Sequence, residues 1–273
     1  GHEVVVCSLH HPDEPDDAVI DGVRVLRADP GLPWLPDDDL VARMASANHQ
    51  LVQLSAQLDD WKPDVIHANE FHSVPQAVAM TKGTQIPVTG HVRLEITPRQ
   101  IETYCMRRCS RIVTVSRAVK SLFSTTDLEN RVDVVYNGVD LSQFSPVGTA
   151  SPTIPPGFSA RPGASTLKVG LFGLISPRKN QLLAAEAVAL ARSRGADVRL
   201  LLAGDAFKTT EAYGAQLRER LAQVDLKEAS VLLPFQKDVA GLYRSIDINL
   251  LISSAEGFGR TIAEAAATRR PSI

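Results

Sequence analysis

The pattern of apolar and polar positions alternates between two periods along the whole chain. Short β-branched or almost continuously apolar runs predict strands, and segments with apolar residues at helical spacing separate them. The segment 180–195, NQLLAAEAVALARSRG, is the clearest predicted helix, with Gly195 just past its end as a stop signal. The predicted strands are residues 2–8, 22–28, 64–70, 87–92, 111–116, 132–137, 167–173, 198–204, 231–235 and 248–252.

This alternation predicts an α/β fold built from doubly wound parallel sheets. The second-half runs are almost continuously apolar, as expected of parallel strands covered on both faces. Residues 145–166 hold five prolines and show no periodicity, so they predict a linker, with a surface loop inside one domain as the alternative. We expect two Rossmann-like domains, residues 1–144 and 167–273, facing a cleft at the carboxyl ends of their strands.

Both ends of the chain suggest a fragment. The sequence opens with GHEVVV, without an initiator methionine, and it stops at RRPSI, where a proline-led buried strand would begin. We therefore expect the second domain to be incomplete and the first domain to lack its first strand.

Composition narrows the class of protein. The 273 residues are 44% hydrophobic with a net charge of −2, which gives no basic excess for nucleic acid or an anionic membrane. The sequence contains no run of about 18 apolar residues, the length needed to span a bilayer. The three cysteines make no disulfide framework, and Cys105 and Cys109 lack further ligands for a metal. We expect a cytoplasmic protein without a metal site, and we interpret the acidic runs 13–17 and 36–40 as solvated loops.

Two carboxylates flank a glycine-rich turn after the last predicted strand. In SSAEGFGRTIAEA, Glu256 precedes the turn, and Glu264 follows eight residues later inside a predicted helix. A helix start presents unpaired N–H groups to a phosphate, and the glycines let the main chain approach a ligand. Carboxylates repel phosphate but accept hydrogen bonds from vicinal hydroxyls, so the motif predicts a nucleotide-sugar site. A loop glutamate and a solvated helix glutamate are the alternative. The turn residues are Gly257, Phe258 and Gly259.

Two other strand ends in the second half carry candidate ligands. The turn at Gly173 leads to Arg178 and Lys179 at a predicted helix start, where the lysine would neutralise a diphosphate unless it is an ordinary surface lysine. The strand 198–204 ends at Gly204 and Asp205 and opens on the same cleft.

In the first half, three polar residues stand at strand ends. His91 ends the strand 87–92, and His67 and Asn69 end the strand 64–70. Each is a candidate ligand of the cleft, with a packed or surface role as the alternative.

These segments together resemble a known family. The stretches RIVTVSRAVKSLF, VDVVYNGVDLSQFSP, SPRKNQ, LLLAGDA and DINLLISSAEGFGRTIAEAAATRRPSI are similar to retaining glycosyltransferase family four, which has the two-domain GT-B fold. The resemblance covers nearly the whole chain. It implies transfer of a sugar from a nucleotide-diphosphate sugar to a sugar, lipid-linked or small-molecule acceptor, with retention of configuration and without a metal or cofactor. Peripheral membrane contact of the complete protein stays open.

The resemblance also implies a role for each candidate residue. Glu256 would contact hydroxyls of the donor sugar, Glu264 the ribose and Lys179 the diphosphate. His91 would lie beside the transferred sugar, so His91, Glu256 and Lys179 are the expected catalytic residues. The further donor-side residues would be Gly173, Arg178, Gly204, Asp205, Gly257, Phe258 and Gly259, and the acceptor-side residues His67 and Asn69.

The chain departs from the family at one position of the site. Leu174 stands where the family usually has an arginine that neutralises the leaving diphosphate, and loss of one such donor costs about 3 kcal/mol of transition-state stabilisation. Arg178 would face about 100° away from Lys179 on a helix. Because terminal segments of the family would also be missing, we expect this exact chain to be inactive.

Three other functions compete with this interpretation. A non-catalytic nucleotide-sugar-binding protein is favoured by Leu174, and a nucleotide-sugar epimerase would use the same donor site. A nicotinamide dehydrogenase is a weaker alternative, because no G-x-G-x-x-G follows a predicted strand.

Overall fold

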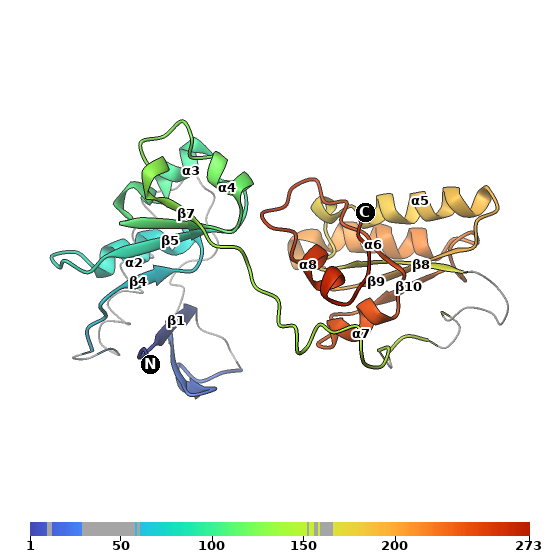
Figure 1. The fold of residues 1–273 in the computed structure, drawn as a ribbon, viewed down its shortest axis with the longest axis horizontal. Coiled ribbons are helices and arrows are strands. Elements are labelled where there is room, and N and C mark those ends of the chain that lie inside the picture. The colour runs from blue at the N-terminus through green and yellow to red at the C-terminus, as the bar shows by residue number, and fades with distance from the viewer. Residues whose placement is uncertain (10–12, 29–57, 59–60, 152, 156–157, 159–165) are drawn as a thin grey trace. The chain divides into compact units, whose positions relative to one another are not determined.

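The computed structural model describes residues 1–9, 13–28, 58, 61–151, 153–155, 158 and 166–273. These residues form two compact units, residues 1–136 and 137–273, and each unit contains a parallel β-sheet with helices against it (Figure 1). The predicted α/β fold class is therefore confirmed.

The C-terminal unit is built on one parallel sheet in the order β10-β9-β8-β11. Its strands are β8 (Leu167–Phe172), β9 (Val198–Ala203), β10 (Ser230–Leu233) and β11 (Ile248–Asn249). Residues 271–273 pair in parallel with β11: the Asn249 amide donates to the Pro271 carbonyl at 2.9 Å, and the Ile273 amide donates to the Asn249 carbonyl at 2.9 Å. The pairing predicted to begin at this proline is present as an isolated bridge, but Pro271 and Ile273 are exposed, so the predicted burial is not observed. The direction of winding reverses between β8 and β11, as in doubly wound nucleotide-binding sheets.

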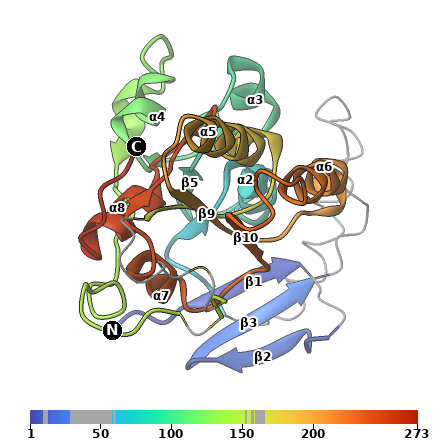
Figure 2. The ribbon, with the colours of Figure 1, turned by 90° about the vertical axis from the view of Figure 1, so that its right-hand side faces the viewer.

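Helices cover both faces of this sheet. They are α5 (Gln181–Ser193), α6 (Glu211–Leu221), α7 (Val239–Arg244) and α8 (Arg260–Ala267). Leu200 and Leu202 of β9 pack with α5 and α6, whereas Leu201 and Ala203 pack with α7 and α8. Successive side chains of a strand point to opposite faces, so the continuous apolar run of β9 is the sequence signature of this double cover (Figures 1 and 2).

The N-terminal unit contains a second parallel sheet with its strands in chain order. These strands are β4 (Ile66–Ala68), β5 (Val88–Val92), β6 (Arg111–Thr114) and β7 (Val132–Val134), and the α-helices beside them are α2 (Val74–Met80), α3 (Pro98–Thr103) and α4 (Arg117–Ser121). The short 3-10 helices of the two units are η1 (Phe71–Ser73), η2 (Met106–Arg108), η3 (Glu129–Arg131), η5 (Pro177–Lys179) and η6 (Lys208–Thr210).

A separate three-stranded sheet corrects the prediction of one parallel sheet per domain. It has the order β1-β3-β2, with β1 (Val5–Leu9), β2 (Asp17–Ile20) and β3 (Val23–Ala28) (Figure 2). The prediction missed β2, which pairs antiparallel with β3 through a turn in which Asp21 and Gly22 have φ of 51° and 80°. An Asp-Gly pair with both φ angles positive is a strong hairpin signal, so the information was in the sequence.

The acidic run 13–17 is also not simply a solvated loop. Asp17 belongs to β2, and its carboxylate accepts a 2.7 Å hydrogen bond from the Arg24 guanidinium of β3. The second acidic run, 36–40, lies outside the described residues.

The described part of the predicted linker 145–166 lies in the C-terminal unit. The Ser151 amide donates to the Gly241 carbonyl at 3.1 Å, and Phe158 is buried in the core beside α7. The boundary between the two units follows Tyr136.

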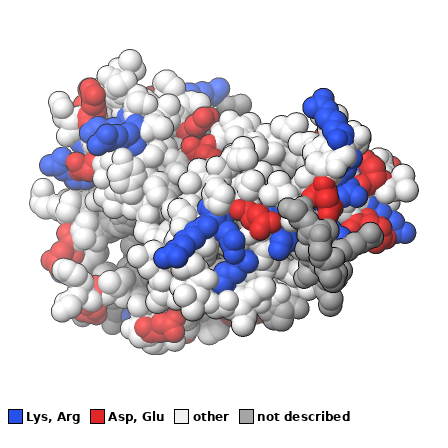
Figure 3. Space-filling view, turned by 45° about the vertical axis from the view of Figure 1, so that its right-hand side comes forward, with Lys and Arg blue, Asp and Glu red and all other residues white. Residues whose placement is uncertain are grey.

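The described surface carries charges of both signs. On the face drawn in Figure 3, basic and acidic side chains lie close to one another. Among the described residues, no helix combines the length and the apolar character needed to cross a membrane.

Two glycines close the carboxyl ends of β8 and β9 against each other. Gly173 and Gly204 have φ of 139° and 147°, a region that side chains with a Cβ rarely adopt. A Cβ on Gly204 would lie 2.0 Å from the carbonyl oxygen of Gly173. The neighbouring ladder hydrogen bond, from the Gly173 amide to the Ala203 carbonyl at 2.9 Å, fixes the two turns at this close approach.

Gly204→Ala should therefore destabilise the C-terminal unit by about 2–4 kcal/mol, because both the φ angle and the backbone contact forbid a Cβ. The change would be measured as a fall in the urea midpoint of unfolding. Gly138→Ala is the matched control, since Gly138 has open space around it and no positive φ, and it should shift stability by less than about 0.5 kcal/mol. Equal midpoints for the two variants would contradict the proposed role of this contact.

Candidate functional site

The segment after β8 and the loop after β11 meet at the point where the sheet reverses its winding. Three hydrogen bonds join them: the Asn180 side-chain amide donates to the Ile252 carbonyl at 2.8 Å, Arg178 Nη1 to the Ala255 carbonyl at 2.8 Å, and the Ser254 amide to the Arg178 carbonyl at 2.9 Å. Ligands of doubly wound sheets bind beside such a reversal, outside the carboxyl ends of the strands. The predicted site residues of these two segments are thus brought together.

The local fold of the first segment differs from the prediction in one detail. Lys179 was expected in the first turn of the long helix, but it ends the separate 3-10 helix η5, which begins at Pro177. Asn180 follows with φ of 57°, and α5 begins at Gln181. Because of this break, the Asn180 side chain lies against the loop after β11. In a continuous helix it would point in another direction.

Lys179 and Arg178 both reach Glu256. Lys179 Nζ forms an ion pair with Glu256 Oε1, and Arg178 Nη1 lies 3.5 Å from the same oxygen. The expectation that Arg178 would face away from Lys179 is therefore wrong, because both side chains are long enough for their charged ends to converge on one carboxylate. Two cations consequently converge on one carboxylate in the segment that follows Leu174.

The electrostatic environment keeps Glu256 ionised. Its side chain is 24% exposed, and burial alone would raise its pKa. The hydrogen bond and charge of Lys179, with Arg178 nearby, outweigh burial and hold the pKa of Glu256 below its ordinary value of 4.5.

Glu264 is held in a fixed orientation within α8. The Tyr243 hydroxyl donates to Glu264 Oε2 at 2.9 Å, and Arg260 Nε lies 3.0 Å from Glu264 Oε1. Burial and the adjacent Glu264 carboxylate raise the pKa of Tyr243 far above its usual range, so the phenol stays protonated and donates. Tyr243 was not predicted as a site residue because it precedes Glu264 by 21 positions.

The glycine turn and Asp205 complete the edge of this sheet. Gly257 and Gly259 are buried, Phe258 is half-buried, and Gly259 has φ of 73° immediately before α8. The Asp205 carbonyl accepts the Ile175 amide at 2.9 Å, and Asp205 Oδ1 accepts the Phe235 amide at 3.2 Å. Asp205 therefore links the strand ends of β8, β9 and β10.

The three first-half candidates lie at the carboxyl ends of β4 and β5 in the N-terminal unit. The rings of His67 and His91 have centroids 5.5 Å apart at an interplanar angle of 69°. Loss of hydration and the charge of Arg93 lower the pKa of both histidines, which favours the neutral imidazoles. Arg93 also donates to Asn69 Oδ1. Arg93, which the sequence interpretation missed, is therefore part of this cluster.

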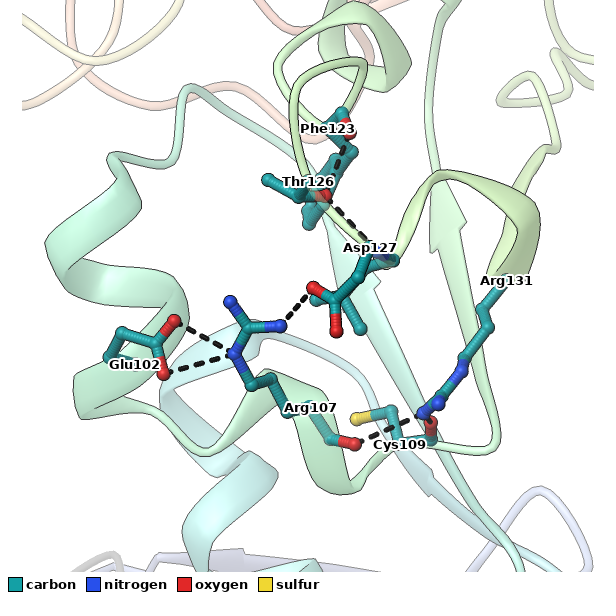
Figure 4. Close-up of polar contacts among 8 residues, drawn as sticks. Glu102, Arg107, Cys109, Phe123, Thr126, Asp127 and Arg131 are labelled. Carbon is teal, nitrogen blue, oxygen red and sulfur yellow. Dashed lines mark hydrogen bonds and ion pairs between the residues drawn. The ribbon is translucent and has the colours of Figure 1, made fainter.

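Cys109, one of the two cysteines considered for a metal site, lies in the hydrophobic core. Cys109 is fully buried, and burial raises the pKa of its thiol to about 11, so it packs as a neutral side chain. Figure 4 shows Arg131 donating to the Arg107 carbonyl at 3.1 Å and, at 3.4 Å, to the carbonyl of Cys109, while Arg107 contacts Glu102. The described residues contain no group of three or more metal-ligating side chains.

Comparison with protein families matches both units. The family model described as Glycosyltransferase Family 4 matches residues 1–143, and the model described as Glycosyl transferases group 1 matches residues 166–273.

Individual proteins agree with this assignment. A D-inositol 3-phosphate glycosyltransferase from Nocardia farcinica is 26% identical over 217 residues, which are 78% of this chain and 46% of that protein. One from Mycobacterium sp. strain KMS is 30% identical over 146 residues, 53% of this chain and 31% of that protein. The chain thus spans less than half of these relatives.

Solved structures confirm the expected GT-B fold. The sucrose-phosphate synthase of Thermosynechococcus elongatus superposes with a TM-score of 0.77 at 18% identity, covering 99% of this chain and 70% of that one. The Anabaena protein HepE in complex with UDP-glucose superposes with a TM-score of 0.70 at 21% identity, covering 92% of this chain and 66% of that one.

Lys179→Met should destabilise the protein by about 1–2 kcal/mol near neutral pH, because it removes the main ion-pair partner of the partly buried Glu256 carboxylate. A carboxyl group with a lowered pKa stabilises the fold above its ordinary value of 4.5 and loses that contribution as the pH falls through the folded pKa. Thermal midpoints measured from about pH 7 to about pH 3 should therefore show the difference from wild type shrinking below about pH 4.5.

Lys208→Met is the control, since Lys208 is exposed on η6 and has no carboxylate partner among the described ion pairs. Its difference from wild type should stay constant with pH. A pH-independent difference for Lys179→Met would show that the ion pair does not stabilise the fold.

Proposed function

The chain belongs to glycosyltransferase family 4, and we propose that it binds a nucleotide-diphosphate sugar at the winding reversal of its C-terminal sheet, the site from which the full-length protein transfers the sugar to an acceptor, while these 273 residues alone are expected to be inactive. The observation that carries this proposal is the convergence of Lys179 and Arg178 on Glu256 beside the start of α8. This arrangement sets cationic donors and a carboxylate acceptor side by side, which suits a ligand that joins a diphosphate to a polyol.

The division of labour follows from the chemistry of each group. An ammonium has three N–H donors, so Lys179 can contact Glu256 and a phosphate oxygen together. The N–H groups at the start of α8 add further donors, and the buried glycines before it let a ligand approach the main chain. Glu256, ionised and 24% exposed, accepts from sugar hydroxyls. Glu264 accepts from the ribose, with Tyr243 and Arg260 fixing its orientation.

The comparisons support the substrate class. The HepE complex contains UDP-glucose, and a similar protein from Xanthomonas campestris, 26% identical over 217 residues, is named for a GDP-mannose donor. We propose a uridine or guanosine diphosphate sugar as the donor. A polyol acceptor is supported by the names of the inositol phosphate relatives. His67 and Asn69 are the proposed acceptor-side residues, and His91 is the proposed catalytic residue beside the transferred sugar. The free cysteines suit a reducing cytoplasm.

We propose a retaining, metal-independent reaction. The bond between the anomeric carbon and the diphosphate oxygen breaks, the acceptor oxygen bonds to that carbon on the same face, and the acceptor's proton passes to the departing phosphate oxygen. Lys179 and Arg178 then offset the charge that develops on the diphosphate. The placement of Arg178 supports this role despite Leu174, and it weighs against the non-catalytic alternative.

Donor binding tests the proposal. Glu256→Gln should lower the affinity for the nucleotide sugar, UDP-glucose or GDP-mannose, about 10- to 100-fold relative to the affinity for UDP or GDP, because the sugar contact is lost while the repulsion between the carboxylate and the diphosphate is relieved. Glu264→Gln should weaken nucleotide and nucleotide sugar equally. Calorimetric titration measures both, with Glu219→Gln on the exposed face of α6 as the control.

Failure of the wild-type chain to bind any of these nucleotides would refute the donor site. An equal loss of nucleotide and nucleotide-sugar affinity in Glu256→Gln would refute the division of labour between the two glutamates.

The stereochemistry and metal requirement have a separate test. In the full-length protein, the transferred sugar should keep its anomeric configuration, as read from the proton coupling of the product by NMR, and a chelator should leave the rate unchanged. Release of an isomerised sugar in the absence of an acceptor would instead identify the epimerase alternative. An inverted product, or a rate restored only by added divalent metal, would contradict the mechanism.

A further inference from the structure

Two phenylalanine side chains at the carboxyl edge of the C-terminal sheet lie outside the core. Of the eight phenylalanines in the chain, five are at most 9% exposed, and Phe258 is half-buried. Phe207 and Phe235 are 64% and 66% exposed, and they follow β9 and β10. Single exposed apolar residues are common, but here both exposed phenylalanines stand at the same edge of one sheet.

The main chain of both residues is fixed. The Phe207 amide donates to Thr210 Oγ1 at 3.0 Å, and the Phe207 carbonyl accepts the Thr210 amide at 2.8 Å. The Phe235 amide donates to Asp205 Oδ1 at 3.2 Å. An aromatic side chain has only two rotatable bonds, so a fixed main chain limits the conformational freedom that each ring would lose on binding a flat ligand.

This edge is continuous with the proposed diphosphate site. Asp205, which holds Phe235 through its side chain, accepts the Ile175 amide through its carbonyl at 2.9 Å. Ile175 lies in the same turn as Lys179, four residues before it. The exposed rings and the phosphate-binding cation therefore belong to neighbouring strand ends within one unit.

We propose that Phe207 and Phe235 stack on the nucleobase of the donor. This inference rests on the proposed function and names the part of that ligand which the glutamates and lysine leave unrecognised. A base is the planar, apolar-faced end of a nucleotide-diphosphate sugar, and the opposite end is assigned to Glu256. Because every base presents a π-face, the stack adds affinity without choosing between uracil and guanine.

The test compares a ligand with a base and one without. Phe207→Ala and Phe235→Ala should each weaken the tighter of UDP and GDP about 5- to 100-fold by calorimetric titration, since a stacked base contributes roughly that factor. Inorganic pyrophosphate, which has no base, should bind the variants as it binds wild type. Phe235→Tyr keeps the ring and should keep the affinity. Val224→Ala removes another exposed apolar side chain, 96% exposed, and should change neither ligand.

The outcomes separate this inference from the proposed function. A selective loss of nucleotide affinity at either phenylalanine supports stacking. Unchanged nucleotide affinity in both variants overturns it while the donor site stands, and a change only in sedimentation would assign the rings to a protein contact. An equal loss of pyrophosphate also overturns it, because the variants would then be distorting the phosphate turn. A wild-type chain that binds neither nucleotide removes both the donor site and this inference.

Discussion

The tie between the segment after β8 and the loop after β11 is the constraint on which the candidate site depends. Each segment alone is a surface connection at a strand end. The hydrogen bonds of Arg178 and Asn180 to main-chain carbonyls of the neighbouring loop, and the ion pair of Lys179 with Glu256, turn them into one surface. A catalytic arrangement needs side chains held to within a fraction of an ångström, and main-chain hydrogen bonds of this kind supply that support.

This tie is possible because the sheet brings the two strand ends together. Strand β8 pairs directly with β11 in parallel, so segments separated by more than 70 residues in sequence begin at the same edge. The close contact between Gly173 and Gly204 then brings the end of β9 against the same edge. Topology thus selects which residues can cooperate, and glycine permits the approach that topology requires.

Residues near one another in sequence, or set by strand periodicity, were predictable. Continuous apolar runs predicted β8 and β9, and strand ends predicted Lys179, Glu256, His67 and His91 as candidates. The partners that fix these side chains were not predictable, because Tyr243, Asn180 and Arg93 act across long sequence separations or through an unexpected helix break. Strand β2, in contrast, was predictable, since the Asp-Gly turn that joins it to β3 is a local hairpin signal.

The same tie explains how two cations can lie side by side in this turn. Unpaired, Lys179 and Arg178 would repel each other across the turn. The Glu256 carboxylate pairs with both and offsets part of their positive charge, at a distance of 3.5 Å from Arg178, and its side chain remains 24% exposed. A ligand that brings negative charge to the cations and hydroxyl groups to the carboxylate satisfies both halves of the cluster at once. A free phosphate satisfies only the cations and meets the repulsion of Glu256. The arrangement therefore suits the proposed ligand, a diphosphate bonded to a sugar, better than it suits either part alone.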